Sequence, residues 1–266
     1  MKKLIYGLFV TLLAVVLTAC GNDDSDKDSA NKSESSSDDK TLVVGTEGTY
    51  APFTFHNKDD ELTGYDIDVT NAVAKEIGYK VEYKETQWDS MFAGLDAGRF
   101  DMIANQVGIN KERQEKYKFS DPYTYSNAVL VVSEDNNDIK SFDDVKGKKL
   151  AQTFTSNYGQ MAKDKGADVT KVDGFNQAMD LILSNRVDGT FNGNVSYLDY
   201  KKQKPSAKIK AIEGDEEQSQ SAFIFTKKED DKKIEDINKA LKKLKDNGEL
   251  TKISKKWFDD DVSEPK

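Results

Sequence analysis

Short apolar runs alternate with amphipathic stretches along the chain after residue 40. Residues 41–45 (TLVVG) form a β-branched run that ends at a glycine, which is typical of a buried strand. Further on, Val69, Val73 and Ile77 form one apolar face of a helix that Gly78 terminates. Strands that alternate with helices predict an α/β fold, in which helices cover a mostly parallel sheet.

Polar residues at the start of these helices are candidates for caps. Asp66 and Asp68 lie at the start of the first helix, and either carboxylate is placed to cap it. A second helix is expected where Met91 and Leu95 recur at helical spacing, with Gly98 as its end. A short strand follows that helix.

The second half of the chain repeats this plan. Residues 96–106 (DAGRFDMIANQ) and 183–193 (LSNRVDGTFNG) both read as a helix end, an aspartate and a short strand that stops at an asparagine. As an internal duplication, the match predicts two lobes of like topology that face each other. Chance similarity over so short a stretch is the alternative.

Two strand-like runs are suited to cross between the lobes. Residues 127–135 (NAVLVVSED) leave the first lobe, and residues 221–230 (SAFIFTKKED) return to it. The first lobe is therefore expected to be discontinuous, at 41–129 plus 224–262, and the second to span 130–223. Two strands would form the hinge between them.

Composition limits the kinds of function. The formal net charge of −9 argues against a nucleic-acid partner, because a phosphate-binding surface needs a basic stripe. The chain has one histidine, His56, and one cysteine, Cys20. These are too few for a His/Cys metal cluster, and they argue against a Cys–His or a Ser–His–Asp catalytic set. No metal site, cofactor or catalytic residue is assigned, and a small molecule or a protein is the expected partner.

The first forty residues have the composition of an exported, anchored protein. Two lysines precede an apolar run over residues 4–19, which is shorter than the roughly 20 residues of a membrane-spanning helix. Residues 17–20 (LTAC) resemble a lipoprotein signal box. We therefore expect a signal peptide over 1–19, and a flexible polar tether over 20–40 that starts at lipidated, palmitate-bearing Cys20. The alternative is an ordinary cleaved signal peptide with an incidental cysteine.

An arginine follows the strand that ends at Asn105. Ligands in open α/β sheets bind beyond the carboxyl ends of strands, and Arg113 lies just beyond such an end. Its guanidinium is suited to grip a carboxylate, although pairing with an acidic neighbour on the surface is the alternative. The matching loop of the other lobe, Thr155, Ser156 and Asn157, precedes a helix whose free N–H groups also suit negative charge.

Several motifs resemble those of one family, the bacterial extracellular solute-binding proteins of the polar amino-acid group (family 3). They are residues 45–55 (GTEGTYAPFTF), 64–69 (GYDIDV), 108–123 (GINKERQEKYKFSDPY) and 244–258 (LKDNGELTKISKKWF). The resemblance covers residues 42–258, and residues 88–108 and 191–200 look most like cystine-binding members.

The resemblance implies a fold, a function and a location. The fold would be a two-lobed, periplasmic-binding-protein-like clamshell of type II, with a mostly parallel sheet flanked by helices in each lobe and a two-strand hinge. The protein would capture an amino acid, above all cystine, and deliver it to an ABC importer made of a permease and an ATPase. It would act as a monomer, without enzymatic activity, at the extracellular face of the cell membrane, held there through Cys20 alone.

The same resemblance assigns ligand-binding roles. The carboxylate clamp falls on Arg113, helped by N–H groups near Gly108 and Ser156, and Gln106 would offer a carbonyl to the ammonium. Glu47 would meet the ligand's side chain. The aromatic walls would be Tyr50, Phe53 and Trp88, for which an ordinary place in the core is the alternative. Thr155, Asn157, Asn192 and Gly193 complete the expected site.

One position departs from the family pattern. Gly193 stands where the family usually has an aspartate for the ligand's ammonium. Asn192, Asn194 or Glu47 would have to substitute, or affinity is weak, or the ligand lacks an ordinary α-ammonium, since a desolvated ammonium needs a partner. Two alternatives therefore stay open: another polar amino acid or small amino-acid-like ligand and, more remotely, a cyclic-acid dehydratase that uses Glu47.

Overall fold

The computed structural model describes residues 40–266. The predicted signal peptide, the predicted lipidation site at Cys20 and all of the predicted tether except Lys40 lie outside these residues. Within the described part, no helix combines the length and the apolar character needed to cross a membrane.

The first lobe is built on a five-stranded sheet of order β5-β1-β6-β15-β7. β1 runs parallel to β5 and β6, and β15 runs antiparallel to both β6 and β7. One apolar core joins the sheet to α1, α7 and α8, and a separate core joins it to α2. The strands are β1 (Lys40–Thr46), β5 (Tyr79–Glu85), β6 (Met102–Ile103), β7 (Tyr117–Phe119) and β15 (Ile224–Thr226). The helices are α1 (Tyr65–Ile77), α2 (Trp88–Asp96), α3 (Lys111–Lys116), α7 (Asp231–Asp246) and α8 (Glu249–Phe258).

The second lobe has a five-stranded sheet of the same plan, in the order β11-β10-β12-β9-β13. β10 is parallel to β11 and β12, and β9 is antiparallel to β12 and β13. Its strands are β9 (Ala128–Ser133), β10 (Lys149–Gln152), β11 (Asp168–Lys171), β12 (Gly189–Gly193) and β13 (Ile209–Glu213). The helical elements are η1 (Phe142–Val145), α4 (Asn157–Asp164), α5 (Phe175–Leu183) and α6 (Asn194–Gln203). The predicted α/β fold with two lobes of like topology is confirmed.

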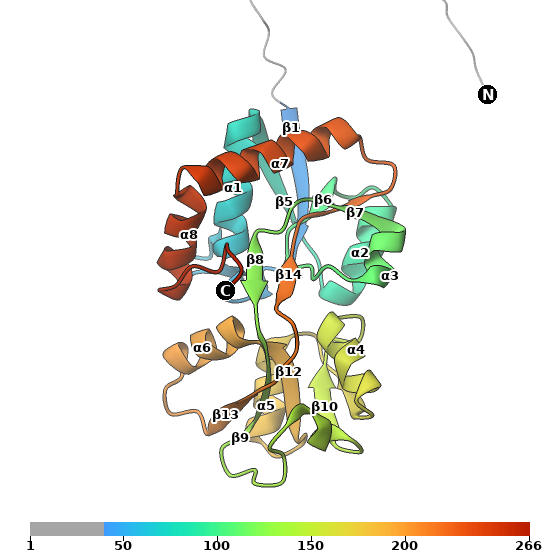
Figure 1. Cartoon of the computed structure of the whole chain (residues 1–266), viewed down its shortest axis with the longest axis vertical. Helices are drawn as coiled ribbons and strands as arrows, with labels where there is room; N and C mark the ends of the chain where they lie inside the picture. Colours follow the sequence, from blue (N-terminus) through green and yellow to red (C-terminus); the bar gives the residue numbers. More distant parts are fainter. Residues whose placement is uncertain (1–39) are drawn as a thin grey trace, which may run out of the picture. The chain divides into compact units, whose positions relative to one another are not determined.

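Two short strands join the lobes. β8 (Thr124–Ser126) and β14 (Ser219–Ser221) pair antiparallel, and Figure 1 shows them between the two sheets. β8 leads into β9 of the second sheet, and β14 leads back into β15 of the first, as a two-strand hinge requires. The exact lobe limits stay a prediction; β9 begins at Ala128, before the predicted boundary at 129/130. A small sheet of β2 (Thr49–Tyr50), β3 (Thr54–His56) and β4 (Leu62–Thr63) precedes α1.

The repeated segments make the same hydrogen bonds. Asp101 Oδ2 accepts from the backbone N–H of Val43 on β1 at 2.8 Å. Asp188 Oδ2 accepts from the backbone N–H of Lys149 on β10 at 2.7 Å. Each aspartate directly precedes a strand, β6 or β12, and ties it to the neighbouring parallel strand, β1 or β10, which gives the sequence match a structural basis.

The predicted helix ends are present, but the predicted cap is wrong. Gly78 ends α1 in the left-handed conformation at φ 75°, as expected for glycine. In the repeat, Gly98 and Asn185 adopt the same conformation after α2 and α5, at φ 69° and 54°. Neither Asp66 nor Asp68 caps α1, because both lie inside its first turn and α1 has no side-chain cap.

Candidate functional site

A cavity lies between the lobes at the carboxyl ends of β1, β6 and β12. Its volume accessible to water-sized groups is about 60 Å³. Seven residues predicted from the sequence line it: Glu47, Tyr50, Trp88, Gln106, Ser156, Asn157 and Asn192. The remaining lining residues are Thr49, Asn105, Thr153, Tyr158, Gly174 and Phe175. Residues far apart in the sequence therefore meet here as the strand-end argument predicts.

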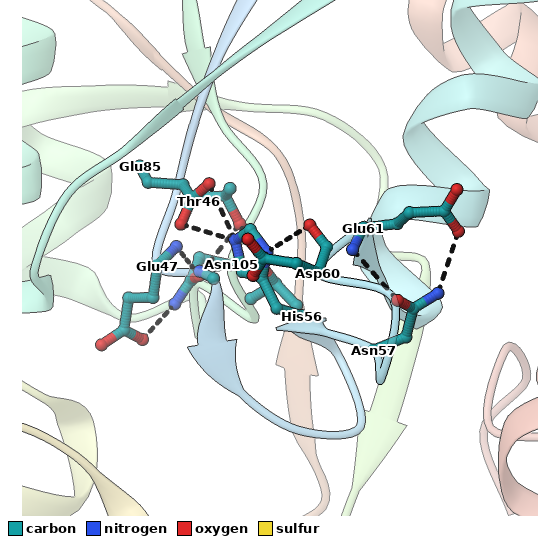
Figure 2. Close-up of polar contacts among 10 residues, drawn as sticks. Thr46, Glu47, His56, Asn57, Asp60, Glu61, Glu85 and Asn105 are labelled. Carbon is teal, nitrogen blue, oxygen red and sulfur yellow. Dashed lines mark hydrogen bonds and ion pairs between the residues drawn. The ribbon is translucent and has the colours of Figure 1, made fainter.

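Glu47 is the carboxylate of this cavity. Asn105 holds it with two hydrogen bonds: the Asn105 Nδ2 donates to Glu47 Oε2 at 2.6 Å, and the Glu47 N–H donates to Asn105 Oδ1 at 2.8 Å (Figure 2). Within residues 40–266 Glu47 forms no ion pair. Burial raises its pKa from 4.5 to about 7, and the nearby Asp89 charge adds to this, against the Asn105 bond and a backbone bond from Trp88. A buried carboxylate with no cation partner is suited to receive one from a ligand.

His56 is also drawn in Figure 2, but its contacts lie outside the cavity. Its Nδ1 lies 3.0 Å from the Asp60 carbonyl and its Nε2 lies 3.0 Å from the Glu85 carboxylate (Figure 2). This exposed group is at the end of β3 and does not line the cavity. His56 is therefore a surface residue outside the candidate site.

Gln106 is fixed by a buried aspartate. The Gln106 N–H donates to Asp66 Oδ2 at 2.8 Å, and its Nε2 donates to Asp66 Oδ1 at 2.6 Å. Gln106 has φ 50°, an uncommon conformation for a residue other than glycine, and these two bonds hold it there. Burial raises the pKa of Asp66 to about 7. Asp66, expected to cap or pack, positions the end of β6 instead.

Arg113 lies at the start of α3, with only 7% of its surface exposed. The Asn110 side chain caps this helix by accepting from the Arg113 N–H at 2.8 Å. The guanidinium carbon lies 5.3 Å from the centre of the Trp88 ring and 5.1 Å from that of Phe92. Burial lowers the pKa of Arg113 to about 10, so the group stays charged at neutral pH.

The guanidinium donates to carbonyls of both lobes. Nη1 of Arg113 donates to the Gly108 carbonyl at 2.8 Å, and Nη2 donates to the Thr155 carbonyl at 3.1 Å. Within residues 40–266 Arg113 forms no ion pair, so the alternative of a surface pair with an acidic neighbour is wrong. Two neutral acceptors leave the positive charge available to an anion.

A second cavity, lined by Arg113, adjoins the first. It lies between α3 and α4, and its volume accessible to water-sized groups is about 350 Å³. It shares Ser156 and Asn157 with the first cavity. Its other lining residues are Asp89, Phe92, Asn110, Glu112, Arg113, Lys116, Tyr117, Phe154, Thr155, Gln160 and Lys163.

Direct contacts hold the lobes together around these cavities. Asp89 accepts from the Thr155 hydroxyl at 2.9 Å and pairs with Lys171 Nζ at 2.8 Å. On the other side of the first cavity, the Tyr50 hydroxyl donates to Asn192 Oδ1 at 2.9 Å. Each contact joins a first-lobe residue to a second-lobe residue, so the cleft is closed in this structure.

Three of the expected site residues, Phe53, Gly108 and Gly193, line neither cavity, although the Gly108 carbonyl accepts a hydrogen bond from Arg113. Phe53 is 3% exposed and belongs to the first-lobe core, where its ring centre lies 5.6 Å from that of Phe258. Gly193 ends β12, and a Cβ added there would lie 3.3 Å from the Tyr158 hydroxyl and 3.5 Å from that of Ser126. Phe53 is therefore a core residue, and the space beside Gly193 is already taken by hydroxyl groups.

Sequence reasoning missed Tyr158 and Phe175, which both line the first cavity. Each lies in the first turn of a second-lobe helix, α4 or α5. The helix starts were readable from the sequence, but which first-turn side chain faces the other lobe depends on how the lobes meet.

We expect Gly193→Asp to destabilise the protein by about 2 kcal/mol, because its carboxylate would be forced against the Tyr158 hydroxyl in a buried site. For a chain of this size the melting temperature should fall by about 5 °C. Thermal unfolding followed by circular dichroism measures the fall. Adding Tyr158→Ala to Gly193→Asp should restore part of the lost melting temperature. If Gly193→Asp alone is as stable as the natural protein, this glycine is not required for packing.

Comparison with known proteins places the chain in a family. Residues 42–260 match the model of the bacterial extracellular solute-binding proteins, family 3. The chain is 49% identical to the L-cystine-binding protein TcyA of Bacillus subtilis, over 99% of this chain and 100% of that protein. It is 34% identical to the L-cystine-binding protein TcyJ of Escherichia coli K12, over 84% of each chain.

Solved structures agree with the fold and with the closed cleft. An ancestral arginine-binding protein bound to arginine matches with a TM-score of 0.77 at 37% identity, over 82% of this chain and 98% of that one. The L-cystine solute receptor of Neisseria gonorrhoeae, unliganded and open, is 48% identical over 85% of this chain and 96% of that one, yet its TM-score is 0.59. The lower score at higher identity fits a difference in lobe closure. The chain belongs to family 3 of the bacterial extracellular solute-binding proteins.

Proposed function

We propose that this protein captures an amino acid, namely cystine, outside the cell and delivers it to an ABC importer. One observation carries the proposal: a buried cation, Arg113, and a half-buried carboxylate, Glu47, line the closed cleft, and neither forms an ion pair within residues 40–266. An amino acid presents the two complementary charges on one carbon. Each unpaired charge in the cleft would gain a partner when that ligand binds.

The relatives support cystine as the ligand. The match to TcyA extends over essentially the whole of both chains, and both TcyA and TcyJ are L-cystine-binding proteins. A second candidate is another polar amino acid or a small amino-acid-like compound. It is favoured by Gly193, where no side chain is available for the ammonium, and by the resemblance to a protein that binds arginine.

In the proposed complex, the ligand's α-carboxylate meets Arg113 and backbone N–H groups near Gly108 and near Ser156 and Asn157, where α4 begins. The α-ammonium meets Glu47, with the carbonyl groups of Gln106 and Asn192 as neutral acceptors. Tyr50 and Trp88 form the aromatic walls. Because these groups come from both lobes, ligand binding favours the closed population.

Binding without turnover is proposed, since the relatives found are solute-binding proteins. Within residues 40–266, no cluster of three or more metal-ligating side chains is present. Incubation with a cyclohexadienyl acid should leave that compound unchanged. Turnover that is lost in Glu47→Gln would support the dehydratase alternative.

We also propose that the protein acts as a monomer and is held at the outer face of the cell membrane by lipid on Cys20. Intact-mass spectrometry of the membrane-extracted protein would test the anchor. The mass should correspond to a chain that begins at Cys20 and carries diacylglycerol and an N-acyl group. An unlipidated mature chain would contradict it.

Calorimetric titration of the protein with a panel of amino acids tests the proposed function. We expect cystine to bind with a stoichiometry of one and more tightly than the other members. If another amino acid binds more tightly, the second candidate replaces cystine. Absence of heat and of displacement across the whole panel would contradict amino-acid capture altogether.

A further inference from the structure

The closed cleft contains two adjoining cavities, and Arg113 lines the second of them. Ser156 and Asn157 line both. The guanidinium of Arg113 packs on Trp88, which lines the first cavity, and on Phe92, which lines the second. A ligand that lies against Ser156 and Asn157 therefore borders both cavities.

The two cavities differ in size in a way that limits the ligand. A cavity needs about 10–15 Å³ of space accessible to a water-sized group in order to hold one water molecule. The first cavity, at about 60 Å³, therefore accommodates about five groups of that size. The ammonium, the α-carbon and the carboxylate of one amino acid supply about that many non-hydrogen atoms. The rest of a longer ligand has to extend elsewhere, and the adjoining cavity offers about 350 Å³.

The second cavity has the charges and the apolar surface that a second amino-acid head needs. Lys163 Nζ lies 3.5 Å from the centre of the Phe154 ring, and that ring is 49% exposed. Lys116 and Glu112 pair at 2.9 Å across one helical turn of α3, and both are mostly exposed. An exposed ion pair of this kind is weak, so its two charges are readily exchanged for those of a ligand.

We propose that the second cavity is a subsite for the distal head of a ligand with two amino-acid ends, an inference that rests on the proposed function. The distal carboxylate would lie between Lys116 and Lys163, and the distal ammonium would meet Glu112. The chain between the two heads would pass along Phe154. The ligand would then bridge α3 of the first lobe and α4 of the second, and a single amino acid would leave this subsite empty.

The test compares two ligands, L-cystine and S-methyl-L-cysteine, which keeps only one amino-acid head. Affinities are measured by calorimetry, with displacement of cystine for weak binding. The natural protein should prefer cystine by about tenfold or more. Glu112→Gln and Phe154→Ala should each weaken cystine about five- to tenfold, and should change S-methyl-L-cysteine less than about twofold.

Leu183→Ala is the matched control, because Leu183 is a 40% exposed apolar residue that lines neither cavity. It should change neither affinity. The subsite is wrong if both ligands bind equally well, if neither Glu112→Gln nor Phe154→Ala changes cystine binding, or if either variant weakens both ligands to the same extent. If the natural protein binds neither compound, the proposed function itself fails.

Discussion

Replacing Arg113 by alanine should weaken amino-acid binding by at least about a hundredfold. The guanidinium is buried and charged, and no acidic side chain within the described residues pairs with it. A charge-assisted hydrogen bond contributes roughly 1.5–3 kcal/mol, and a carboxylate held by both arms of the guanidinium would make two of them. Calorimetric titration with cystine measures the loss.

Two further variants separate ligand binding from folding. Arg113→Lys keeps the charge but loses the planar fork, so it should recover only part of the affinity. Arg99→Ala removes an exposed arginine and should leave binding unchanged. Because Arg113 packs on Trp88 and Phe92, some loss of thermal stability in Arg113→Ala is expected. Cystine binding by Arg113→Ala at the natural affinity would show that the arginine is structural.

Glu47→Gln should weaken binding about ten- to a hundredfold at pH 8 and at the same time stabilise the empty protein. The glutamine keeps the shape of the side chain and can still bond to Asn105, but it offers no charge to an ammonium. The gain in stability follows from burial, which raises the pKa of Glu47 from 4.5 to about 7. That shift corresponds to a cost of roughly 3 kcal/mol for holding the carboxylate ionised in the empty cleft.

The sign of the pH dependence follows from this raised pKa. Between about pH 4.5 and 7 the folded protein keeps a proton on Glu47 that the unfolded chain has released. The stabilisation from the protonated group is therefore full below pH 4.5 and is lost as the pH rises through 7. The advantage of Glu47→Gln in the free energy of unfolding should grow over that range and then level off.

Ligand affinity should change in the opposite direction, because an ammonium ligand needs the ionised carboxylate. Cystine should bind the natural protein more weakly below pH 7, and Glu47→Gln should lack this dependence. Asp66, whose pKa is also about 7, is unchanged in the variant, so the comparison isolates Glu47. Equal pH profiles of affinity for the two proteins would contradict the assignment of Glu47 to the ammonium.

Much of the fold could be predicted because local signals and the duplication agree. Gly78 marks the end of α1 by a conformation that glycine adopts easily, and apolar spacing marks its buried face. The repeated aspartates, Asp101 and Asp188, proved to make equivalent bonds to β1 and β10, which hold the same place in the two sheets. Such features depend on residues close in the sequence or on strand order alone.

The details of the site could be predicted less well, because they depend on contacts between distant residues. Nothing in the local sequence shows that Asn105 orients Glu47 or that Asp66 fixes Gln106. Phe53 follows the same strand as the site residues but turns into the core. An aromatic residue near a strand end suits a ligand wall and a core equally, and only the packing of the lobe decides.

The crystal structure of the protein with cystine is the most direct test of the central claim. We expect one α-carboxylate of cystine within hydrogen-bond distance of the Arg113 guanidinium and the adjacent ammonium within hydrogen-bond distance of Glu47, with both lobes in contact with the ligand. A complex in which cystine lies outside the cleft, or in which neither charged side chain touches it, would contradict the account.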